Sequence, residues 1–356
     1  MKKLTVVAFS VILTLLLGCS IKQKQTTRDV WTKEQANTWY QKWGWLRGSD
    51  FIPSTAINQL EMWQAETFDT ATIDKELGWA SSIGMNCMRV YLHHVAWQYN
   101  SSGFIQRMHQ YLDIADKHGI STIFVFFDDC WNAEYMPGKQ PEPKTGIHNS
   151  GWVRDPGDLI FRDTVLYIVL EKYVKDVLQE FSQDKRIVLW DLYNEPGNSD
   201  LGNKSFPLLK KVFQWGREVN PSQPLSAGVW DESLTVLTKY QLENSDVITY
   251  HDYNSYEEHL QRIVRLRQYG KPLICTEYMA RKRNSTFETI MPMLKKENIG
   301  AINWGLVSGK TNTIYAWDTP MEDGAEPILW FHDIFRSDGT PYKQEEVDII
   351  KQLTGK

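Results

Sequence analysis

The sequence has little cysteine, and it almost lacks long runs of hydrophobic or of basic residues. Its four cysteines, Cys19, Cys87, Cys130 and Cys275, form no CxxC pair and show no metal-ligand spacing among 356 residues, which argues against a disulfide framework and a cysteine metal centre. The net charge is −5 and no cluster of lysine and arginine occurs, so we expect no nucleic-acid partner. After residue 17 no apolar run approaches the length of a membrane span.

The composition is that of an ordinary globular protein with many aromatic residues. Hydrophobic residues make up 42% of the chain and charged residues 23%, with 22 glycines and 14 prolines, which excludes disorder, collagen and coiled coil. The chain holds 15 tryptophans, 16 tyrosines and 14 phenylalanines. In an acidic protein these rings suit flat surfaces for stacking sugars, and they suit the filling of a large core equally well.

The first residues have the pattern of an export signal. Lys2 and Lys3 precede the apolar stretch 4–17, which is short for a bilayer span. The string Leu16-Leu17-Gly18-Cys19-Ser20 resembles the bacterial lipobox, and this resemblance implies cleavage before Cys19 and a diacylglycerol on its thiol. Several acyl chains together anchor a protein stably. An ordinary secretory signal with a chance cysteine is the alternative.

The division of the chain follows from this signal. We expect a signal peptide at 1–19, a polar tether at 20–30 and one domain at 31–356. Ser20 stands where inner-membrane lipoproteins of enteric bacteria carry aspartate, so we expect a lipid anchor in the outer membrane of a bacterial cell envelope. That lipid is the only membrane contact expected, and we expect a monomer.

Short β-rich runs alternate with amphipathic helical patterns along the whole domain. Runs such as Ile-Phe-Val-Phe-Phe are apolar without alternation, as in parallel strands that are buried on both faces. The strands are predicted at 44–47, 87–92, 122–127, 187–192, 224–229, 247–250, 273–276 and 301–306, and the helices at 70–83, 104–118, 163–182, 208–219, 232–240, 257–269 and 286–297.

Eight such units match a single (β/α)₈ barrel in number and length. A doubly wound open sheet is the alternative, but residues 48–53 lack the glycine-rich turn that it would need after its first strand. The long aromatic loops 131–161 and 308–330 then lie at the C-terminal face of the barrel, where active sites of this fold are found.

Two glutamates stand at predicted strand ends on nearly opposite sides of this barrel. Glu195 follows the fourth strand and Glu277 the seventh, so both side chains can point across one barrel mouth. Pro196 favours an extended backbone at Glu195. Retaining glycosidases need one carboxylic acid and one carboxylate about 5–5.5 Å apart. The pattern therefore predicts such a pair, with product that keeps the anomeric configuration.

The motifs around these glutamates resemble the clan of retaining (β/α)₈ glycosidases, and most closely its cellulase/mannanase-type family 5. The matching residues are Arg89 after Asn86-Cys87-Met88, Asn194-Glu195-Pro196, His251 and Tyr253 in His-Asp-Tyr, Glu277, and Trp304 in Ile-Asn-Trp-Gly. The resemblance implies that Glu195 is the acid/base, Glu277 the nucleophile, and the other residues supports of the reacting sugar. The sequence departs from the family at 128–132, where a histidine is often found.

The expected roles follow from simple electrostatics. Arg89 can neutralise Glu277 and Tyr253 can donate a hydrogen bond to it, and both interactions favour its charged form. Glu195 must be protonated, and a second carboxylate with aromatic walls raises its pKa. We expect Asn194 to contact the 2-hydroxyl of the sugar. No cofactor is expected.

Weaker candidates surround this set. Asp128, Asp129, Trp131 and His148 can line the cleft, and Trp152, Trp230 and Trp317 can stack on sugars. Adjacent residues on a strand face opposite sides, so we expect no metal at His93 and His94. The thiols of Cys87, Cys130 and Cys275 are interpreted as packing groups.

Two other functions remain open at this point. A non-catalytic carbohydrate-binding lipoprotein could use the same barrel, although it would not need both glutamates. A metal-dependent barrel hydrolase would have an early His-x-His at the first strand, which residues 44–50 lack. The expected substrate is a β-linked oligo- or polysaccharide of the mannan, glucan or xylan type, and host glycans are also open.

Overall fold

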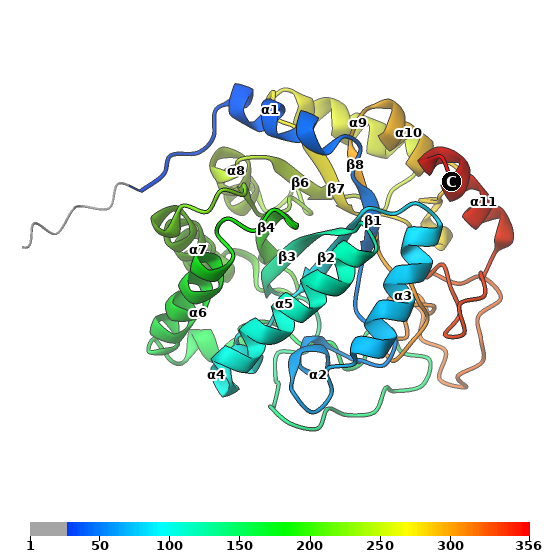
Figure 1. The fold of residues 1–356 in the computed structure, drawn as a ribbon, viewed down its shortest axis with the longest axis horizontal. Coiled ribbons are helices and arrows are strands. Elements are labelled where there is room, and N and C mark those ends of the chain that lie inside the picture. The colour runs from blue at the N-terminus through cyan, green and yellow to red at the C-terminus, as the bar shows by residue number, and fades with distance from the viewer. Residues whose placement is uncertain (1–26) are drawn as a thin grey trace, which may run out of the picture.

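Eight parallel strands form the centre of the molecule, in the order β5-β4-β3-β2-β1-β8-β7-β6 (Figure 1). The structure is a computed structural model, and it describes residues 27–356. The expected signal peptide and Cys19 lie outside the described residues. The strands are β1 (Arg47–Asp50), β2 (Cys87–Tyr91), β3 (Ser121–Asp128), β4 (Ile187–Asn194), β5 (Leu225–Ser226), β6 (Ile248–His251), β7 (Leu273–Glu277) and β8 (Gly300–Asn303).

The sheet closes between its two edge strands. Val229, just after β5, forms a parallel bridge with Tyr250 of β6. The amide of Val229 donates to the carbonyl of Thr249 at 3.0 Å, and the amide of His251 donates to the carbonyl of Val229 at 3.0 Å. The (β/α)₈ barrel expected from the sequence is thereby confirmed.

Helices surround the strands (Figure 1). Those that alternate with the strands lie close to their predicted places, although the last of them, α10, begins four residues late. The α-helices are α1 (Lys33–Trp43), α2 (Gln59–Trp63), α3 (Thr70–Ser82), α4 (His94–Tyr99), α5 (Ser101–Lys117), α6 (Leu166–Glu180), α7 (Phe206–Val219), α8 (Thr235–Asn244), α9 (Tyr256–Arg267), α10 (Ile290–Lys296) and α11 (Gln344–Thr354). Three short 3₁₀ helices are η1 (Gly157–Phe161), η2 (Gly202–Ser205) and η3 (Arg281–Arg283).

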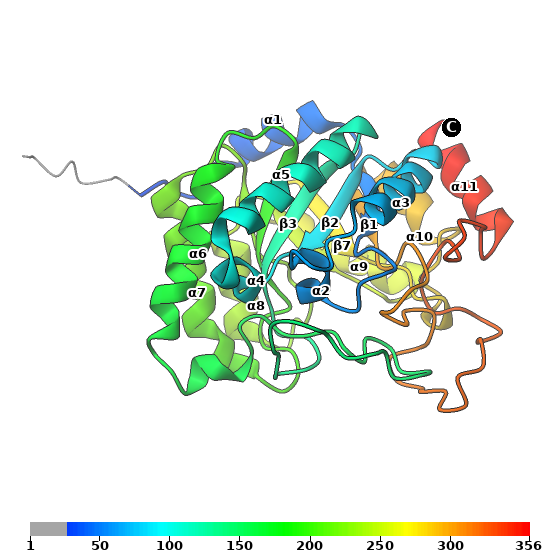
Figure 2. The ribbon, with the colours of Figure 1, turned by 60° about the horizontal axis from the view of Figure 1, so that its bottom comes forward.

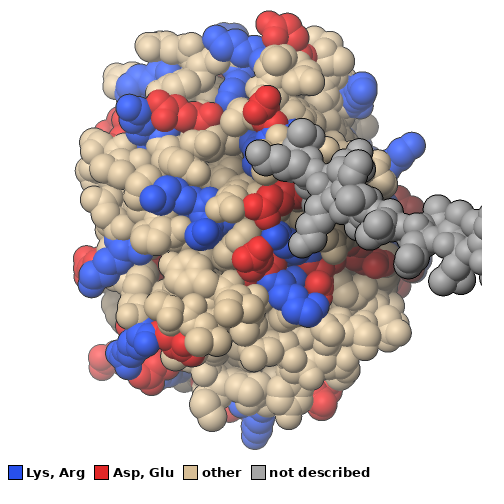
Figure 3. Space-filling model, turned by 90° about the vertical axis from the view of Figure 1, so that its left-hand side faces the viewer, with Lys and Arg blue, Asp and Glu red and all other residues tan. Residues whose placement is uncertain are grey.

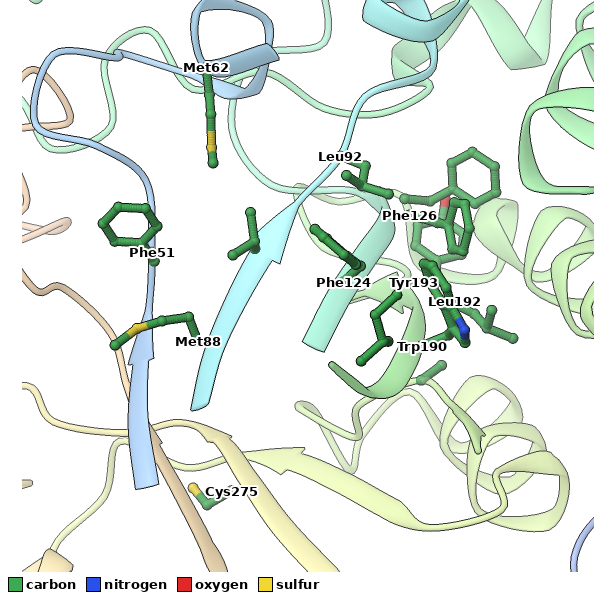
Figure 4. Close-up of a cluster of buried hydrophobic side chains, with 14 of the residues drawn as sticks. Phe51, Met62, Met88, Leu92, Phe124, Phe126, Trp190, Leu192, Tyr193 and Cys275 are labelled. Atoms are coloured by element: carbon green, nitrogen blue, oxygen red, sulfur yellow. The ribbon is translucent and has the colours of Figure 1, made fainter. Parts of the chain in front are cut away.

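The main core lies between the strands and these helices. Figure 4 shows part of it, with Phe124, Phe126 and Trp190 side by side on β3 and β4. The ring of Trp190 stacks on both phenylalanines, with centroids 5.8 Å and 5.4 Å away. Burial of each such ring stabilises the fold by roughly 1.5–3 kcal/mol. The thiols of Cys87 and Cys275 are buried in strands, in agreement with their predicted packing role.

The N-terminal end of the barrel is covered by α1, which the sequence analysis did not predict. Thr32 and Gln35 form a capping box at its start, so two otherwise unpaired amides are satisfied. Ala36 and Tyr40 of α1 pack against strand residues at this end of the barrel, including Ile274 and Ile302. The helix therefore closes the end of the barrel that lies opposite the long loops (Figure 2).

One predicted strand is displaced and another is shorter than expected. The first was expected at 44–47, but β1 is Arg47–Asp50, and the fifth was expected at 224–229, but β5 has only two residues. Neither segment is rich in β-branched residues, so its place is fixed by pairing with neighbouring strands and not by its own propensity.

Charges on the side of the barrel formed by α6, α7 and α8 are mixed in sign. Figure 3 shows lysine and arginine interspersed with aspartate and glutamate on this face. Lys175, for example, lies between Glu171 and Glu218, at 2.5 Å and 2.6 Å. Within residues 27–356, no helix is both long and apolar enough to cross a membrane.

Candidate active site

A cleft of about 400 Å³ opens at the C-terminal ends of the strands, where active sites of this fold lie. Arg89 and His251 are buried and reach the cleft through hydrogen bonds to the two glutamates. Among the residues predicted from the sequence, those that line the cleft include Trp131, Asn194, Glu195, Tyr253, Glu277 and Trp304. The structure therefore brings together side chains from β2, β4, β6, β7 and β8.

The two glutamates face each other at short range. A carboxylate oxygen of Glu195, a ring nitrogen of His251 and a carboxylate oxygen of Glu277 all lie within 4.8 Å of one another. Retaining glycosidases hold their carboxyl groups about 5–5.5 Å apart, and inverting ones about 6.5–9.5 Å apart. The observed spacing agrees with the retaining class.

Arg89 is the centre of a buried charge network under the cleft. Its Nη1 donates to Oε1 of Glu277 at 2.9 Å and to Oδ1 of Asp50 at 2.8 Å. Its Nη2 donates to Oδ2 of Asp191 at 2.8 Å and to Oδ1 of Asn194 at 2.6 Å. One guanidinium thus faces three carboxylates, and burial raises the pKa of both Asp50 and Asp191. The network fixes Glu277 and Asn194 in place.

Three donors converge on the carboxylate of Glu277. Besides Arg89, the hydroxyl of Tyr91 donates to Oε1 at 2.9 Å and that of Tyr253 donates to Oε2 at 2.8 Å. Burial raises the pKa of Glu277, and the nearby Glu195 adds to this, whereas Arg89 and Tyr253 lower it. The expectation that Arg89 and Tyr253 favour the charged form is correct, but burial outweighs them in the net direction.

The carboxyl group of Glu195 has weaker partners. Nδ1 of His251 lies 2.7 Å from its Oε1, and the thiol of Cys130 lies 3.3 Å from its Oε2. Burial raises the pKa of Glu195, and burial lowers the pKa of His251 to about 4. His251 is therefore neutral at pH 7. It brings no cationic charge to Glu195 to favour the carboxylate.

Of the two glutamates, Glu195 is the better place for a proton. Glu277 has an arginine and two tyrosine hydroxyls as donors, and each of them stabilises an ionised carboxylate. Glu195 has no cationic donor. When two close carboxyl groups share one proton, the proton favours the group whose charged form is stabilised less.

Cys130 belongs to the cleft and does not only pack. Its thiol donates to Oε2 of Glu195, and its sulfur accepts from Nδ2 of Asn194 at 3.4 Å. Burial raises the pKa of this thiol well above its usual value, so it is an uncharged donor. The packing role expected from the sequence describes Cys87 and Cys275 but not Cys130.

Replacement of Cys130 by alanine is expected to move the alkaline limb of activity to higher pH. The thiol stabilises the carboxylate form of Glu195, so its loss raises the pKa of that group, and an acid that works when protonated then stays active to higher pH. We expect kcat to stay within about tenfold of wild type. The measurement is the pH profile of kcat/KM. Cys130→Ser is the control, because serine keeps a hydrogen-bond donor. An alkaline limb at the same pH in both variants would contradict a role of the thiol hydrogen bond.

The backbone at Glu195 corrects one expectation. The proline that follows predicts an extended residue, but φ of Glu195 is +43°. Two hydrogen bonds hold this turn: the amide of Asn198 donates to the carbonyl of Glu195 at 3.0 Å, and the amide of Gly197 donates to Oδ2 of Asp129 at 2.7 Å. Backbone strain of this kind is common at functional positions.

The last residue of β3, Asp128, and the residue after it, Asp129, lie on different sides. Asp128 lines the cleft, where its oxygens accept from Asn194 at 2.9 Å and from the indole of Trp152 at 2.6 Å. Asp129, expected at the sugar, lies behind the strand end and accepts from Tyr193 and Gly197. Asp129 therefore shapes the turn that carries Glu195 and does not line the cleft.

Aromatic residues form the floor and walls of the cleft. Trp304 lies against Trp152 and Tyr91, with ring centroids 5.5 Å and 5.8 Å away. Trp131, His148, Trp230 and Trp317 also line the cleft, as proposed from the sequence. Trp152 also lines the cleft, although it is almost fully buried and its indole donates to Asp128.

His93 and His94 do not face opposite sides, which corrects the reason given against a metal there. Their rings stack with centroids 5.2 Å apart, and Nδ1 of each lies within 4.0 Å of Asp155. Their nitrogens have other partners, because Nδ1 of His93 accepts from the amide of Val95 at 3.2 Å and Nε2 of His94 lies 3.5 Å from the hydroxyl of Tyr135. The pair orders the loops behind β2.

A family model decides which family this site belongs to. The model described as cellulase (glycosyl hydrolase family 5) matches residues 48–310, a span that includes both glutamates, Arg89 and Trp304. The chain belongs to glycosyl hydrolase family 5. It is therefore an O-glycosyl hydrolase, and the family predicted from the sequence motifs is confirmed.

Several solved structures share this fold. A GH5_18 protein from Streptomyces cattleya in complex with Manβ1-4GlcNAc is 10% identical, with 87% of this chain and 80% of that chain covered and a TM-score of 0.62. The exo-β-1,4-mannosidase Op5Man5 from Opitutaceae bacterium strain TAV5 is 15% identical (87% and 60% covered, TM-score 0.61). The endo-β-1,4-mannanase from Thermotoga petrophila is 15% identical (88% and 76%, TM-score 0.56). The comparison with curated protein sequences finds no match.

Sequence reasoning missed several residues of this family 5 site. Tyr91 and Asp50 touch the Arg89 network from β2 and β1, and Asp191 touches it from the middle of β4. Asn198 donates from Nδ2 to Oε2 of Glu195. The one available signal was Asp191, a charged residue inside an apolar parallel strand, because such a residue needs a buried partner.

Proposed function

We propose that this family 5 hydrolase cleaves β-linked glycosidic bonds of oligo- or polysaccharides by double displacement, with net retention at the anomeric carbon. The observation that carries the proposal is the placement of Glu195 and Glu277, because one carboxylate oxygen of each lies within 4.8 Å of the other. This spacing leaves no room for the water that an inverting reaction places between carboxylate and sugar.

In the first step Glu277 is the nucleophile. One of its oxygens bonds to the anomeric carbon while the bond from that carbon to the leaving oxygen breaks. Arg89, Tyr91 and Tyr253 stabilise the ionised form of Glu277 and aim its carboxylate before the attack. Their hydrogen bonds also stabilise the carboxylate when it leaves again in the second step.

Glu195 is the acid in this first step and the base in the second. Its proton goes to the leaving oxygen, so the departing sugar leaves as a neutral alcohol. The resulting carboxylate then takes a proton from water, and the water oxygen bonds to the anomeric carbon as Glu277 is released. Burial raises the pKa of Glu195, which favours the protonated form that the first step needs.

The sugar is held between Asn194 and Trp304. Oδ1 of Asn194 accepts from Arg89, and its Nδ2 donates to Asp128 and Cys130. These contacts fix the amide at the cleft, where the second lone pair of Oδ1 can accept from a 2-hydroxyl. Trp304 supplies a flat apolar surface below the ring. We propose mannan-, glucan- or xylan-type substrates. The relatives named above act on or bind β-mannosides, so these should be tested first.

Hydrolysis of a panel of 4-nitrophenyl β-glycosides tests this function. We expect release of nitrophenol from at least one β-glycoside, and the same rate with and without EDTA. Binding of sugars without any hydrolysis would favour the non-catalytic alternative. Loss of activity with EDTA, restored by added metal, would favour a metal-dependent hydrolase.

We also propose that the chain is exported and anchored by a lipid on Cys19. The lipobox-like string at residues 16–20 supports this. Arg28 donates to the carbonyl of Pro221 at 2.8 Å, just before β5, and pairs with Asp246, just before β6. The chain therefore enters at the end of the barrel opposite the cleft, and such an anchor would leave the cleft facing away from the membrane.

Replacement of Cys19 by serine is expected to abolish the lipid and to move the protein to the soluble envelope fraction, because one thiol carries the anchor. The measurement is incorporation of labelled palmitate together with membrane fractionation. Cys130→Ser is the matched control and should keep the label. Equal labelling of wild type and C19S would contradict the proposal.

A further inference from the structure

One side of the cleft is a continuous wall of rings. Trp131 contacts His148 with centroids 5.3 Å apart, His148 contacts Trp317 at 6.2 Å, and Trp317 contacts Tyr253 at 5.0 Å. The series runs from the end of β3, through the two long loops, to the end of β6. All four residues line the cleft. We call them the aromatic wall.

The loop after β3 and the loop after β8 carry most of this wall, and backbone hydrogen bonds connect them. The amide of Met321 donates to the carbonyl of Gly146 at 3.0 Å, and the amide of Asn149 donates to the carbonyl of Thr311 at 2.8 Å. Figure 2 shows the loop after β3 and the loop after β8 reaching each other below the barrel. The wall is thus held between two loops that are far apart in the sequence.

Side chains add to this connection. Nδ2 of Asn312 donates to the carbonyls of Lys144 and Ile147, at 2.9 Å and 3.3 Å. Burial lowers the pKa of His148 to about 4, so its neutral ring donates from Nδ1 to the carbonyl of Tyr315 at 2.9 Å. His148, a member of the wall, is therefore fixed to the opposite loop.

The far end of the second loop is fixed to the barrel by a buried arginine. Arg281 donates to the carbonyls of Trp330 and Asp333, at 3.1 Å and 2.9 Å. Its charge is paired with Glu346 of α11, also buried, at 2.5 Å. The loop after β8 is thus held at the wall and at its end.

The side of the cleft that holds the acid is lined by a different set of residues. Glu195, Asn198, Ser199 and Trp230 line it there. The leaving oxygen must lie on this side because Glu195 protonates it. The sugar that Glu277 attacks must then lie on the other side, between Trp304 and the aromatic wall.

We propose that the aromatic wall ends the cleft just beyond the sugar that is attacked, so that the enzyme removes single units from the non-reducing ends of short β-linked oligosaccharides. This inference rests on the proposed function, and it adds the mode of attack. A volume of about 400 Å³ is at the lower end of the range of ligand pockets, in keeping with a short substrate.

The first test follows products from β-1,4-mannohexaose and cellohexaose that carry a fluorescent label at the reducing end. We expect the first labelled product to be one unit shorter, followed by a stepwise ladder. Early release of short labelled pieces would overturn the inference while leaving glycoside hydrolysis intact. If neither the labelled chains nor any 4-nitrophenyl β-glycoside is cleaved, the proposed function itself fails.

The second test uses substitutions that break the contacts between the loop after β3 and the loop after β8. An added Cβ at Gly146 would lie 1.7 Å from the carbonyl oxygen of Met321, whereas one at Gly138 in the same loop meets no atom within 4 Å. Both glycines have positive φ, +70° and +91°, so Gly138→Ala is a matched control for backbone strain. Asn312→Gly removes two cross-loop hydrogen bonds and tolerates the left-handed backbone at this position, φ +58°.

The readout is the ratio of kcat/KM for two aryl β-glycosides, one blocked at its non-reducing end by a 4,6-benzylidene group and one unblocked. We expect wild type and G138A to reject the blocked substrate, and G146A or N312G to raise the ratio at least tenfold. Thermal melting shows which variants are folded. A blocked substrate cleaved by wild type as fast as the unblocked one, or a folded N312G with the wild-type ratio, would overturn the inference.

Discussion

Replacement of Glu277 by glutamine is expected to lower kcat by at least roughly 10⁴-fold, which corresponds to about 5 kcal/mol of transition-state stabilisation. The amide has nearly the shape of the carboxylate but cannot form the glycosyl ester. Arg89, Tyr91 and Tyr253 surround the side chain on one side, so the sugar side of the cleft is left unchanged. The affinity for an intact oligosaccharide is therefore expected to change by less than about tenfold.

Steady-state kinetics measure kcat, and calorimetry on the same preparation measures the affinity for the oligosaccharide. Glu142→Gln is the matched control, because Glu142 is an exposed glutamate in the loop after β3 and should leave kcat unchanged. A melting curve excludes unfolding of the buried site. Retention of more than a tenth of wild-type kcat in E277Q would contradict the assignment of the nucleophile.

Replacement of Glu195 by alanine is expected to produce a loss that depends on the leaving group. For an alkyl or sugar leaving group, kcat/KM should fall by roughly 10²–10⁴-fold, because general acid catalysis is lost. For a 2,4-dinitrophenyl glycoside the leaving oxygen needs no proton, so formation of the glycosyl enzyme should stay fast. Its hydrolysis then becomes slow, since no base activates water.

Azide distinguishes Glu195 from a merely structural residue. It needs no base, so it should accelerate turnover of the dinitrophenyl substrate by E195A and yield a β-glycosyl azide. His251→Ala removes a contact to Glu195 but leaves the carboxyl group, and it should show no azide dependence. Equal losses of E195A on good and poor leaving groups, without azide rescue, would contradict the assignment of the acid/base.

The barrel itself is predictable because its central strands are buried on both faces. β3 and β4 have eight residues each, nearly all buried, and such strands read as apolar runs. The helix α1 is not predictable in the same way, because its packing partners are spread along the whole chain from Leu46 to Ile302. Local sequence does not contain that information.

The candidate site is predictable where each functional residue stands at the end of a recognisable strand. Glu195, Glu277, Arg89 and His251 meet because parallel strands end at the same face. The end of β3 shows the limit, since successive side chains alternate in direction. Asp128 and Cys130 accordingly reach the cleft and Asp129 between them does not, although the sequence analysis expected Asp129 there as well as Asp128.

The aromatic wall is the part that sequence reasoning could not supply. His148 donates to the carbonyl of Tyr315, 167 residues further along the chain, and no local pattern connects the two. The turn at Glu195 is similar, because the rule for residues before proline is overridden by the contact between Asp129 and Gly197. Both features depend on tertiary hydrogen bonds, which local propensity does not encode.

Proton NMR of the first product tests the central claim most directly. The claim is that Glu277 attacks the anomeric carbon and that Glu195 delivers and then removes the proton, with their carboxylate oxygens within 4.8 Å. Two successive displacements at one carbon restore its configuration. In a reaction followed from its first minutes, before mutarotation, a β-glycoside should therefore release the β-anomer of the free sugar first. Initial release of the α-anomer would contradict both the double displacement and the role of Glu277.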